Sequence, residues 1–243
     1  MEGALAIVLR LPEPPALTVA GRTDAGVHAL GQVAHVDLPA GVEVERLAAR
    51  CNGVLPADVR TASVQVAPAG FDARFSVLSR RYGYRVADPS TRPDPLRRLD
   101  TLTHPRDLDV ERMRLATAGL LGEHDFAAYC RRREGAGTVR RLLRLDWARD
   151  ADGVVLALVE ADAFCRSMVR SLVGALVAVG EGRREVTWPA AVLRSGVRDP
   201  GATVAPAHGL TLLRVCYPPA GELAERARVT RKRRDRETFA GGD

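Results

Sequence analysis

A loop of small residues at positions 21–29 (GRTDAGVHA) lies between two strand-like segments, residues 17–20 and 33–37. A strand, a tight loop and a second strand together hold one side chain rigid within the loop. The side chain placed in this way is the carboxylate of Asp24. The segment therefore predicts a β-containing fold that presents a fixed acidic group.

The same loop does not match the common nucleotide-binding motifs. Gly21 and Gly26 have the spacing of a P-loop. However, Val27 and His28 stand where that motif requires Lys and Ser or Thr. A G-x-G-x-x-G sequence does not occur here either. The loop therefore argues against a simple nucleotide cradle.

Two interpretations of Asp24 stay open on the residues alone. Asp is favoured in turns because its side chain accepts hydrogen bonds from nearby backbone N–H groups, so Asp24 would then only stabilise the loop. In the second interpretation, the charge of Arg22, two residues earlier, keeps the carboxylate ionised. An ionised Asp in a sheltered loop can act as a nucleophile or general base.

Length and hydrophobic pattern indicate an ordinary folded protein. A chain of 243 residues forms one large domain or two small ones, with a sizeable core in either case. No apolar run reaches the roughly 18 residues of a membrane span, and the N-terminus lacks a signal-peptide pattern. We therefore expect a cytoplasmic protein without a membrane partner.

The net charge of +6 has two explanations. A basic protein favours a polyanionic partner such as nucleic acid. Alternatively, the charge reflects an arginine-rich composition, because Lys232 is the one lysine among 36 basic residues. Charge alone therefore supports an RNA partner only weakly.

The chain shows no metal-ligand pattern. His28 and His35 lie close in sequence, but no third ligand follows at short range, so loop packing is the better interpretation of His28. The four cysteines are too widely spaced for a zinc motif or a dense disulfide framework: Cys51, Cys130, Cys165 and Cys216. We expect these cysteines to be reduced and mostly buried.

Periodicity predicts strands and helices in both halves of the chain. The expected helices are residues 44–52, 110–121, 166–179 and 189–195, and the expected strands are 59–66, 81–86, 138–147, 154–161 and 210–216. Residues 88–107 carry four prolines and no periodicity, which is typical of a boundary.

This order of elements predicts an α+β fold with two similar lobes of mixed or antiparallel sheet, helices on one side and an active-site cleft between them. The expected N-terminal lobe with the catalytic loop is residues 1–95, and the C-terminal lobe is 96–218. Residues 219–243 lack an apolar pattern and predict a basic, disordered tail, either solvated or in non-specific contact with RNA.

Two pairs of side chains have both a structural and a functional interpretation. Arg166 and Arg170, four residues apart, form a surface pair, or one of them reaches inward to a catalytic carboxylate. Tyr82 and Tyr84 share one strand face and are either core residues or, beside arginines, a platform for base stacking.

Six ordered segments resemble the motifs of the tRNA pseudouridine synthase A (TruA) family. They span roughly residues 2–218 and comprise GRTDAGVHA at 21–29, RCNGVLP at 50–56, FDARFS with RRYGY at 71–84, LGEHDF at 121–126, FCRSMVRSLVG at 164–174 and APAHGL at 205–210. The chain is identified as a member of that family on these residues.

The resemblance implies isomerisation of uridine to pseudouridine at positions 38, 39 and 40 of the tRNA anticodon stem-loop. It implies that Asp24 is the catalytic aspartate and Arg170 its basic partner. Tyr82 would stack on the target uracil, and Arg22 would contact the RNA backbone and help to flip the nucleotide. It also implies a homodimer without metal or organic cofactor.

The chain departs from the family pattern at its start. The family has a first strand and an aromatic-Gly-Trp loop before the catalytic loop, whereas only 23 residues precede Asp24 here. We therefore expect the native product to be longer. The alternative function is a catalytically impaired RNA-binding remnant, and a third interpretation is a synthase of the same fold that acts on other RNA.

Overall fold

The computed structural model describes residues 1–131 and 137–239. Contacts between Cα atoms group the chain into two compact units. Unit 1 comprises Met1–Gly21, Val33–Val77 and Pro218–Thr230, whereas unit 2 comprises Arg22–Gln32, Leu78–Tyr217 and the chain from Arg231 onward.

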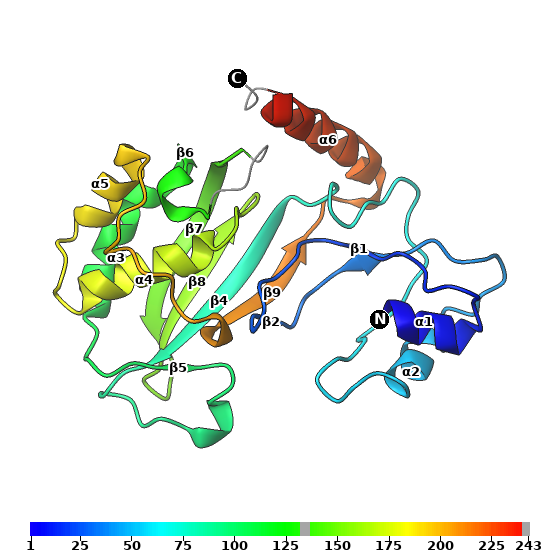
Figure 1. Cartoon of the computed structure of the whole chain (residues 1–243), viewed down its shortest axis with the longest axis horizontal. Coiled ribbons are helices and arrows are strands. Elements are labelled where there is room, and N and C mark those ends of the chain that lie inside the picture. Colours follow the sequence, from blue (N-terminus) through cyan, green and yellow to red (C-terminus); the bar gives the residue numbers. More distant parts are fainter. Residues whose placement is uncertain (132–136, 240–243) are drawn as a thin grey trace. The chain divides into compact units, whose positions relative to one another are not determined.

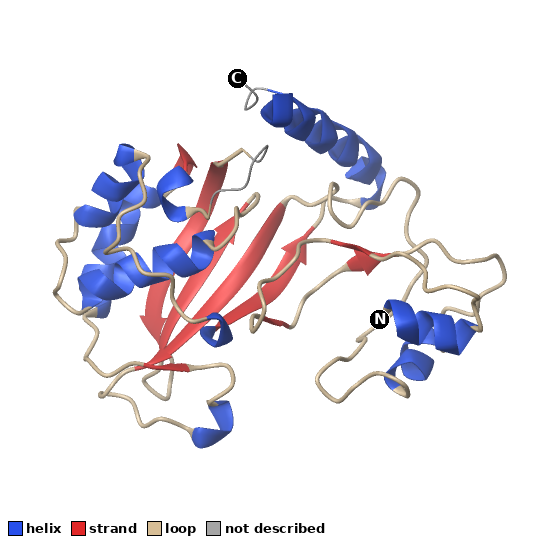
Figure 2. Ribbon diagram, viewed as in Figure 1, coloured by secondary structure: helices blue, strands red, loops and turns tan. Residues whose placement is uncertain are grey.

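Unit 2 is built on a mixed, mainly antiparallel sheet, drawn in red in Figure 2. Within the described residues the sheet has seven strands, ordered β2 (His28–Ala29), β9 (Leu210–Cys216), β4 (Ser79–Ala87), β8 (Val155–Ala161), β7 (Val139–Arg149) and β6 (Gly122–Asp125), with β5 (Leu102–Thr103) paired to β4. The pairs β2–β9 and β4–β5 are parallel, and the other neighbours are antiparallel. The predicted α+β class is confirmed.

One face of this sheet forms the core of unit 2. Side chains alternate along β4, so that Tyr82 and Tyr84 are buried. Tyr82 lies opposite Val159 of β8 and Leu212 of β9, which are also buried. The helices α3 (Val110–Thr117), α4 (Met168–Gly180) and α5 (Trp188–Ser195) pack against one another beside the sheet (Figure 1). Short 3₁₀ turns complete the unit: η1 (Pro95–Arg97), η2 (Ala118–Leu120), η3 (Ala127–Tyr129) and η4 (Ala207–Gly209).

Helix α4 is buried along its whole length except at one residue. Of its thirteen residues, every one but Arg170 is buried. Gly174 allows close approach of the neighbouring chain, because a Cβ there would lie 1.8 Å from the carbonyl oxygen of Thr203. The helix therefore presents a single partly exposed guanidinium, whereas its other residues are buried.

Unit 1 has its own small core. Strand β1 (Thr18–Val19) pairs antiparallel with β3 (Ala34–His35), which confirms the two predicted strands that flank the loop. Helices α1 (Glu2–Leu9) and α2 (Leu47–Asn52) bury Leu5, Leu47 and Cys51 together. After η5 (Ala220–Glu222), helix α6 (Leu223–Phe239) begins in this unit with Leu223 and Ala227 buried.

Two predicted elements differ in the structure. Residues 59–66 form no strand, because the amide side chain of Asn52 binds both the N–H and the carbonyl oxygen of Thr61 at 2.8 and 2.9 Å. The predicted disordered tail contains α6, in which Leu223 and Ala227, four residues apart, provide the buried face that the basic composition obscured. Arg226 further anchors the helix by donating from Nε to the carbonyl oxygen of Val77 at 3.0 Å.

The compact units also differ from the predicted lobes 1–95 and 96–218. Strand β4 pairs along most of its length with β8 and β9, so its residues group with the later part of the chain. The loop at 22–32 joins the same unit through β2. The two units differ in secondary structure, because the seven described strands of the large sheet all belong to unit 2.

No helix in the described part of the chain has the length and apolarity to cross a membrane.

The segment that follows β4 is anchored by an ion pair whose carboxylate is buried. The carboxylate of Asp88 accepts hydrogen bonds from Arg149 Nη2 at 2.7 Å, Ser90 Oγ at 2.7 Å and the Leu108 N–H at 3.0 Å. Burial alone would raise the pKa of Asp88, but these hydrogen bonds outweigh it and hold that pKa well below its ordinary value. The Asp88 carboxylate is therefore ionised at neutral pH and accepts these hydrogen bonds in its charged form.

We expect Asp88→Asn to lower the free energy of unfolding by about 3 kcal/mol at neutral pH, because it leaves Arg149 without its buried partner. Since the folded pKa is depressed, the contribution of Asp88 is present above the unfolded pKa of about 3.9 and is lost as pH falls below it. Urea unfolding of both proteins should show the difference narrowing towards pH of about 3. Asp100→Asn, in a more exposed pair with Arg97, should cost less than about 1 kcal/mol. Equal losses from both variants would contradict this account.

Candidate active site

The loop that carries Asp24 contains a turn that is held by a backbone hydrogen bond and by a tightly packed glycine. The carbonyl oxygen of Asp24 accepts a hydrogen bond from the Val27 N–H at 3.1 Å. Gly26 adopts a φ of +80°, which L side chains rarely adopt, and a Cβ there would lie 3.3 Å from the Cβ of Ala207. The glycine is therefore required by both the turn and the close approach of the chain at Ala207.

After the turn, the chain is tied to the edge of the large sheet. The N–H groups of Leu30 and Gly31 both donate to the carbonyl oxygen of Leu212, at 2.9 and 3.2 Å. A Cβ on Gly31 would lie 2.3 Å from the carbonyl oxygen of Leu213, so only glycine fits here. His28 Nε2 donates to the Leu99 carbonyl oxygen at 2.6 Å. Asp24 thus stands in a loop with little freedom to move.

Asp24 forms an ion pair with Arg170. Arg170 Nη1 lies 3.1 Å from Asp24 Oδ2, and the two side chains are 19% and 32% exposed. The same guanidinium donates from Nε to the carbonyl oxygen of Ala205 at 2.6 Å. Two hydrogen bonds in different directions fix the planar group, which a single contact would not do. The pair combines a fixed negative charge with access for a ligand.

Tyr82 lies near this pair on β4. The residue is 7% exposed, and its ring meets the ring of Phe164 edge to face, with centroids 5.2 Å apart and an interplanar angle of 88°. Burial raises the pKa of the Tyr82 hydroxyl, the charge of Arg80 lowers it, and the charge of Asp24 raises it further. The hydroxyl therefore keeps its proton at neutral pH.

The other two arginines considered from the sequence are placed differently. Arg22 is exposed, and the described residues provide it with no ion pair, so the cation that holds Asp24 is Arg170. Arg166 is also exposed and precedes α4, which begins at Met168. Of the two candidates on the predicted helix, the structure therefore brings Arg170 to the carboxylate.

The histidines of the predicted loop region serve in packing. His35 Nδ1 accepts a hydrogen bond from the Ala73 N–H at 3.0 Å, and His28 is held by Leu99 as described. Among the described residues, no three His, Cys, Asp or Glu side chains are arranged to hold a metal ion. These interactions agree with the packing interpretation of His28.

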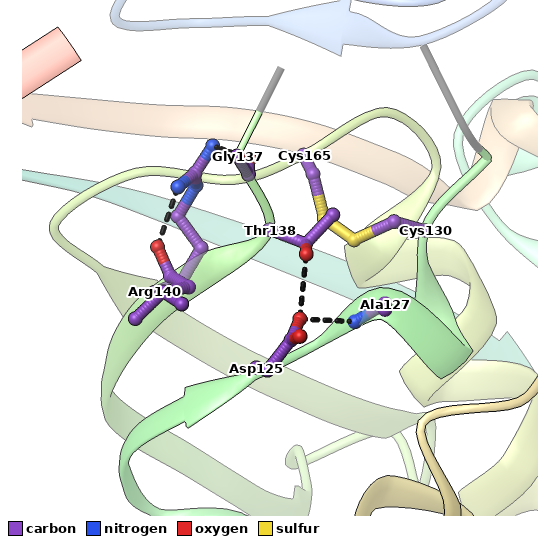
Figure 3. Close-up of a disulfide and its surroundings, with 8 residues drawn as sticks. Asp125, Ala127, Cys130, Gly137, Thr138, Arg140 and Cys165 are labelled. Carbon is purple, nitrogen blue, oxygen red and sulfur yellow. Dashed lines mark hydrogen bonds between the residues drawn. A yellow bond between two sulfur atoms is a disulfide. The ribbon is translucent and has the colours of Figure 1, made fainter. Parts of the chain in front are cut away.

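A disulfide joins Cys130 and Cys165, with their Cα atoms 5.7 Å apart (Figure 3). The prediction that all four cysteines are reduced is therefore wrong for this pair, whereas Cys51 and Cys216 are free. Sequence spacing did not reveal the pair because the fold, not a local motif, brings together the end of η3 and the segment before α4. A hydrogen bond from the Arg131 N–H to the Arg166 carbonyl oxygen, at 2.9 Å, reinforces this link.

Below the disulfide, the carboxylate of Asp125 closes the connection between β6 and β7 (Figure 3). It accepts hydrogen bonds from Thr138 Oγ1 at 2.5 Å and from the Ala127 N–H at 2.9 Å. This gives a structural role to the aspartate of the LGEHDF motif. Asp125 therefore binds groups that follow β6 and precede β7, whereas the acidic group of the candidate site is Asp24.

Sequence reasoning missed the contributions of Ala205 and Phe164. Both lie in motifs that were recognised, but Ala205 acts through its backbone carbonyl and Phe164 through a ring contact. A backbone acceptor leaves no signal in residue type. Only their place within the motifs 205–210 and 164–174 pointed to them.

Comparison with known proteins finds relatives that cover most of the chain. A family model described as tRNA pseudouridine synthase matches residues 116–218. A Frankia casuarinae protein named tRNA pseudouridine synthase A is 66% identical over 95% of this chain and 84% of its own length. Proteins of the same name from Streptomyces griseus and Streptomyces avermitilis are 56% and 53% identical, over 95% and 96% of this chain and 83% and 84% of their own lengths.

These matches place the chain, which has an α+β fold, among the isomerases. More narrowly, the chain belongs to the tRNA pseudouridine synthase A family.

Proposed function

We propose that this protein isomerises uridine to pseudouridine at positions 38, 39 and 40 of the tRNA anticodon stem-loop. The observation that carries the proposal is the Asp24–Arg170 ion pair, in which Arg170 Nη1 lies 3.1 Å from Asp24 Oδ2. The isomerisation that we propose uses a carboxylate held in one orientation, and the ion pair of Asp24 with Arg170 supports this role. The names of the relatives support tRNA as the substrate.

The reaction breaks the N-glycosidic bond, rotates the uracil and joins its C5 to C1′ of the same ribose. Asp24 either attacks C1′ as a nucleophile or begins the reaction by removing the proton at C2′. Both routes use the carboxylate in its ionised form, and the guanidinium of Arg170 lies 3.1 Å from it with the opposite charge. When C5 bonds to C1′, Asp24 leaves C1′ or, in the second route, the proton taken from C2′ is returned. The hydrogen at C5 finally leaves as a proton, to Asp24 or to a water held near Tyr82, and N1 takes up a proton, so that the product is an isomer of uridine.

The target uridine must leave the stem before it can react. Extruding a nucleotide costs a few kcal/mol, and stacking on an aromatic ring returns about 1–3 kcal/mol per base. In this proposal the uracil stacks on Tyr82, whose ring Phe164 orients. The exposed Arg22 contacts the RNA backbone and assists the flip. The net charge of +6 favours the polyanionic substrate.

The proposal includes a cytoplasmic homodimer that takes one tRNA across both subunits and uses no cofactor or metal. Sedimentation at micromolar concentration should then report twice the mass of the chain. A monomeric mass in the presence of active turnover would contradict this part of the proposal alone.

The direct test uses two tRNA transcripts that differ only at positions 38–40, with uridine in one and cytidine in the other. We expect nucleoside analysis to find pseudouridine in the first transcript and not in the second. Binding of both transcripts is measured in parallel. Equal binding without product would instead support the RNA-binding remnant, and product in the cytidine transcript would support a different target site.

A further inference from the structure

Tyr84 is a fully buried tyrosine that the proposed chemistry does not use. It lies two residues after Tyr82 on β4, and its exposed fraction is 0%. Its hydroxyl donates a hydrogen bond to the carbonyl oxygen of Pro206 at 2.8 Å. A buried hydroxyl with a backbone partner fixes that stretch of chain, because losing the bond would leave the carbonyl unsatisfied.

The stretch that Tyr84 holds, residues 205–207, contacts both sides of the Asp24–Arg170 pair. Ala205 exchanges two hydrogen bonds with Arg170, accepting from Nε at 2.6 Å and donating from its N–H to the Arg170 carbonyl oxygen at 3.0 Å. The Cβ of Ala207 lies against Gly26, in the turn that carries Asp24. Movement of this stretch would therefore displace the guanidinium and the carboxylate together.

Close packing restricts the ring of Tyr84 to one position. Gly209, just after this stretch, packs directly on the ring, and a Cβ there would lie 2.7 Å from Tyr84 Cζ. Across the sheet, Tyr84 lies opposite Ala157 of β8 and Leu210 of β9. The hydroxyl is thus aimed at Pro206 by close packing on the ring.

We propose that Tyr84 is a positioning residue, which holds residues 205–207 and through them directs the guanidinium of Arg170 at Asp24. The expected effect on turnover rests on the proposed function. The structural link from Tyr84 through residues 205–207 to Arg170 does not depend on it. The side chain touches no reacting atom in this scheme. It acts by keeping Arg170 in the geometry that the carboxylate needs.

The test compares Tyr84→Phe with Tyr129→Phe. Tyr129 is the matched control, because its side chain is also 0% exposed and its hydroxyl donates to the carbonyl oxygen of Pro189 at 2.7 Å. We expect Tyr84→Phe to lower kcat roughly tenfold or more, since small displacements of a catalytic group have effects of this size. KM for tRNA should stay within about twofold, and Tyr129→Phe should leave kcat unchanged. An unchanged kcat in Tyr84→Phe, or equal losses in both variants, would overturn the inference.

A double-mutant cycle separates this inference from the proposed function. If Tyr84 acts through Arg170, the shifts in urea midpoint caused by Tyr84→Phe and Arg170→Ala will be less than additive in the double variant. Tyr129→Phe combined with Arg170→Ala should be additive. The urea midpoints do not depend on turnover. They therefore test the link between Tyr84 and Arg170 even if the wild-type protein forms no pseudouridine, a result that would contradict the proposed function alone. Additive shifts for Tyr84 would reject the link.

Discussion

Asp24→Asn is expected to lower the single-turnover rate of pseudouridine formation by at least about 10³-fold. Asn has nearly the same shape and can still accept a hydrogen bond from Arg170, so the loop should remain in place. It carries no negative charge, however, and can neither attack C1′ nor take a proton from C2′. A loss of this size corresponds to about 4 kcal/mol of transition-state stabilisation.

The matched control for this variant is Asp150→Asn. Asp150 also pairs with an arginine, Arg85, at 3.4 Å and with similar exposure, but it lies in the turn between β7 and β8. Asp150→Asn should turn over like the wild type. The affinity of Asp24→Asn for tRNA should change by less than about threefold, because one loop carboxylate contributes little to phosphate binding. A variant at Asp24 that retains a tenth of the rate or more would exclude the catalytic role.

Arg170→Ala is expected to lower kcat by roughly 10²-fold, the usual effect of removing a preorganised charged donor. The loss has two parts, because the guanidinium binds Asp24 and the carbonyl oxygen of Ala205 at the same time. Arg170→Lys restores the charge, but an ammonium cannot reproduce the two bonds of the planar group. Its kcat should therefore fall between those of the wild type and Arg170→Ala.

The control for Arg170 is Arg166→Ala, which removes an exposed arginine four residues earlier in the same motif. At saturating tRNA its kcat should match that of the wild type. If Arg166→Ala and Arg170→Ala lose kcat equally, the guanidinium acts through general charge and not through the pair with Asp24. If Arg170→Lys is fully active, the bond to Ala205 has no part in catalysis.

The sequence was sufficient to predict those parts of the fold that have a periodic pattern. Strand β9 coincides with its predicted range, and β4, α3 and α4 differ by a few residues at their ends. Residues 59–66 alternate like a strand, but their backbone groups have local partners in Asn52, which alternation does not reveal. Helix α6 was missed because its buried residues Leu223 and Ala227 lie beside a strongly basic sequence.

The site was predictable in its residue types but not in its connections. The loop marked Asp24, yet the residues alone left Arg22, Arg166 and Arg170 as candidate partners. The choice depends on where α4 begins, and on which of its residues is not buried. The support from Ala205 and Pro206 runs through backbone carbonyls, for which residue type carries no signal.

In the proposed reaction the protein moves the glycosidic bond of uridine from N1 to C5, and this transfer expels the hydrogen at C5. The most direct measurement uses a tRNA transcript that carries tritium at C5 of the uridines at positions 38–40. Wild-type protein should release one tritium to water for each pseudouridine formed, and Asp24→Asn should release none above background. Retention of the tritium by tRNA that the wild-type protein binds, or equal release by both proteins, would contradict the account.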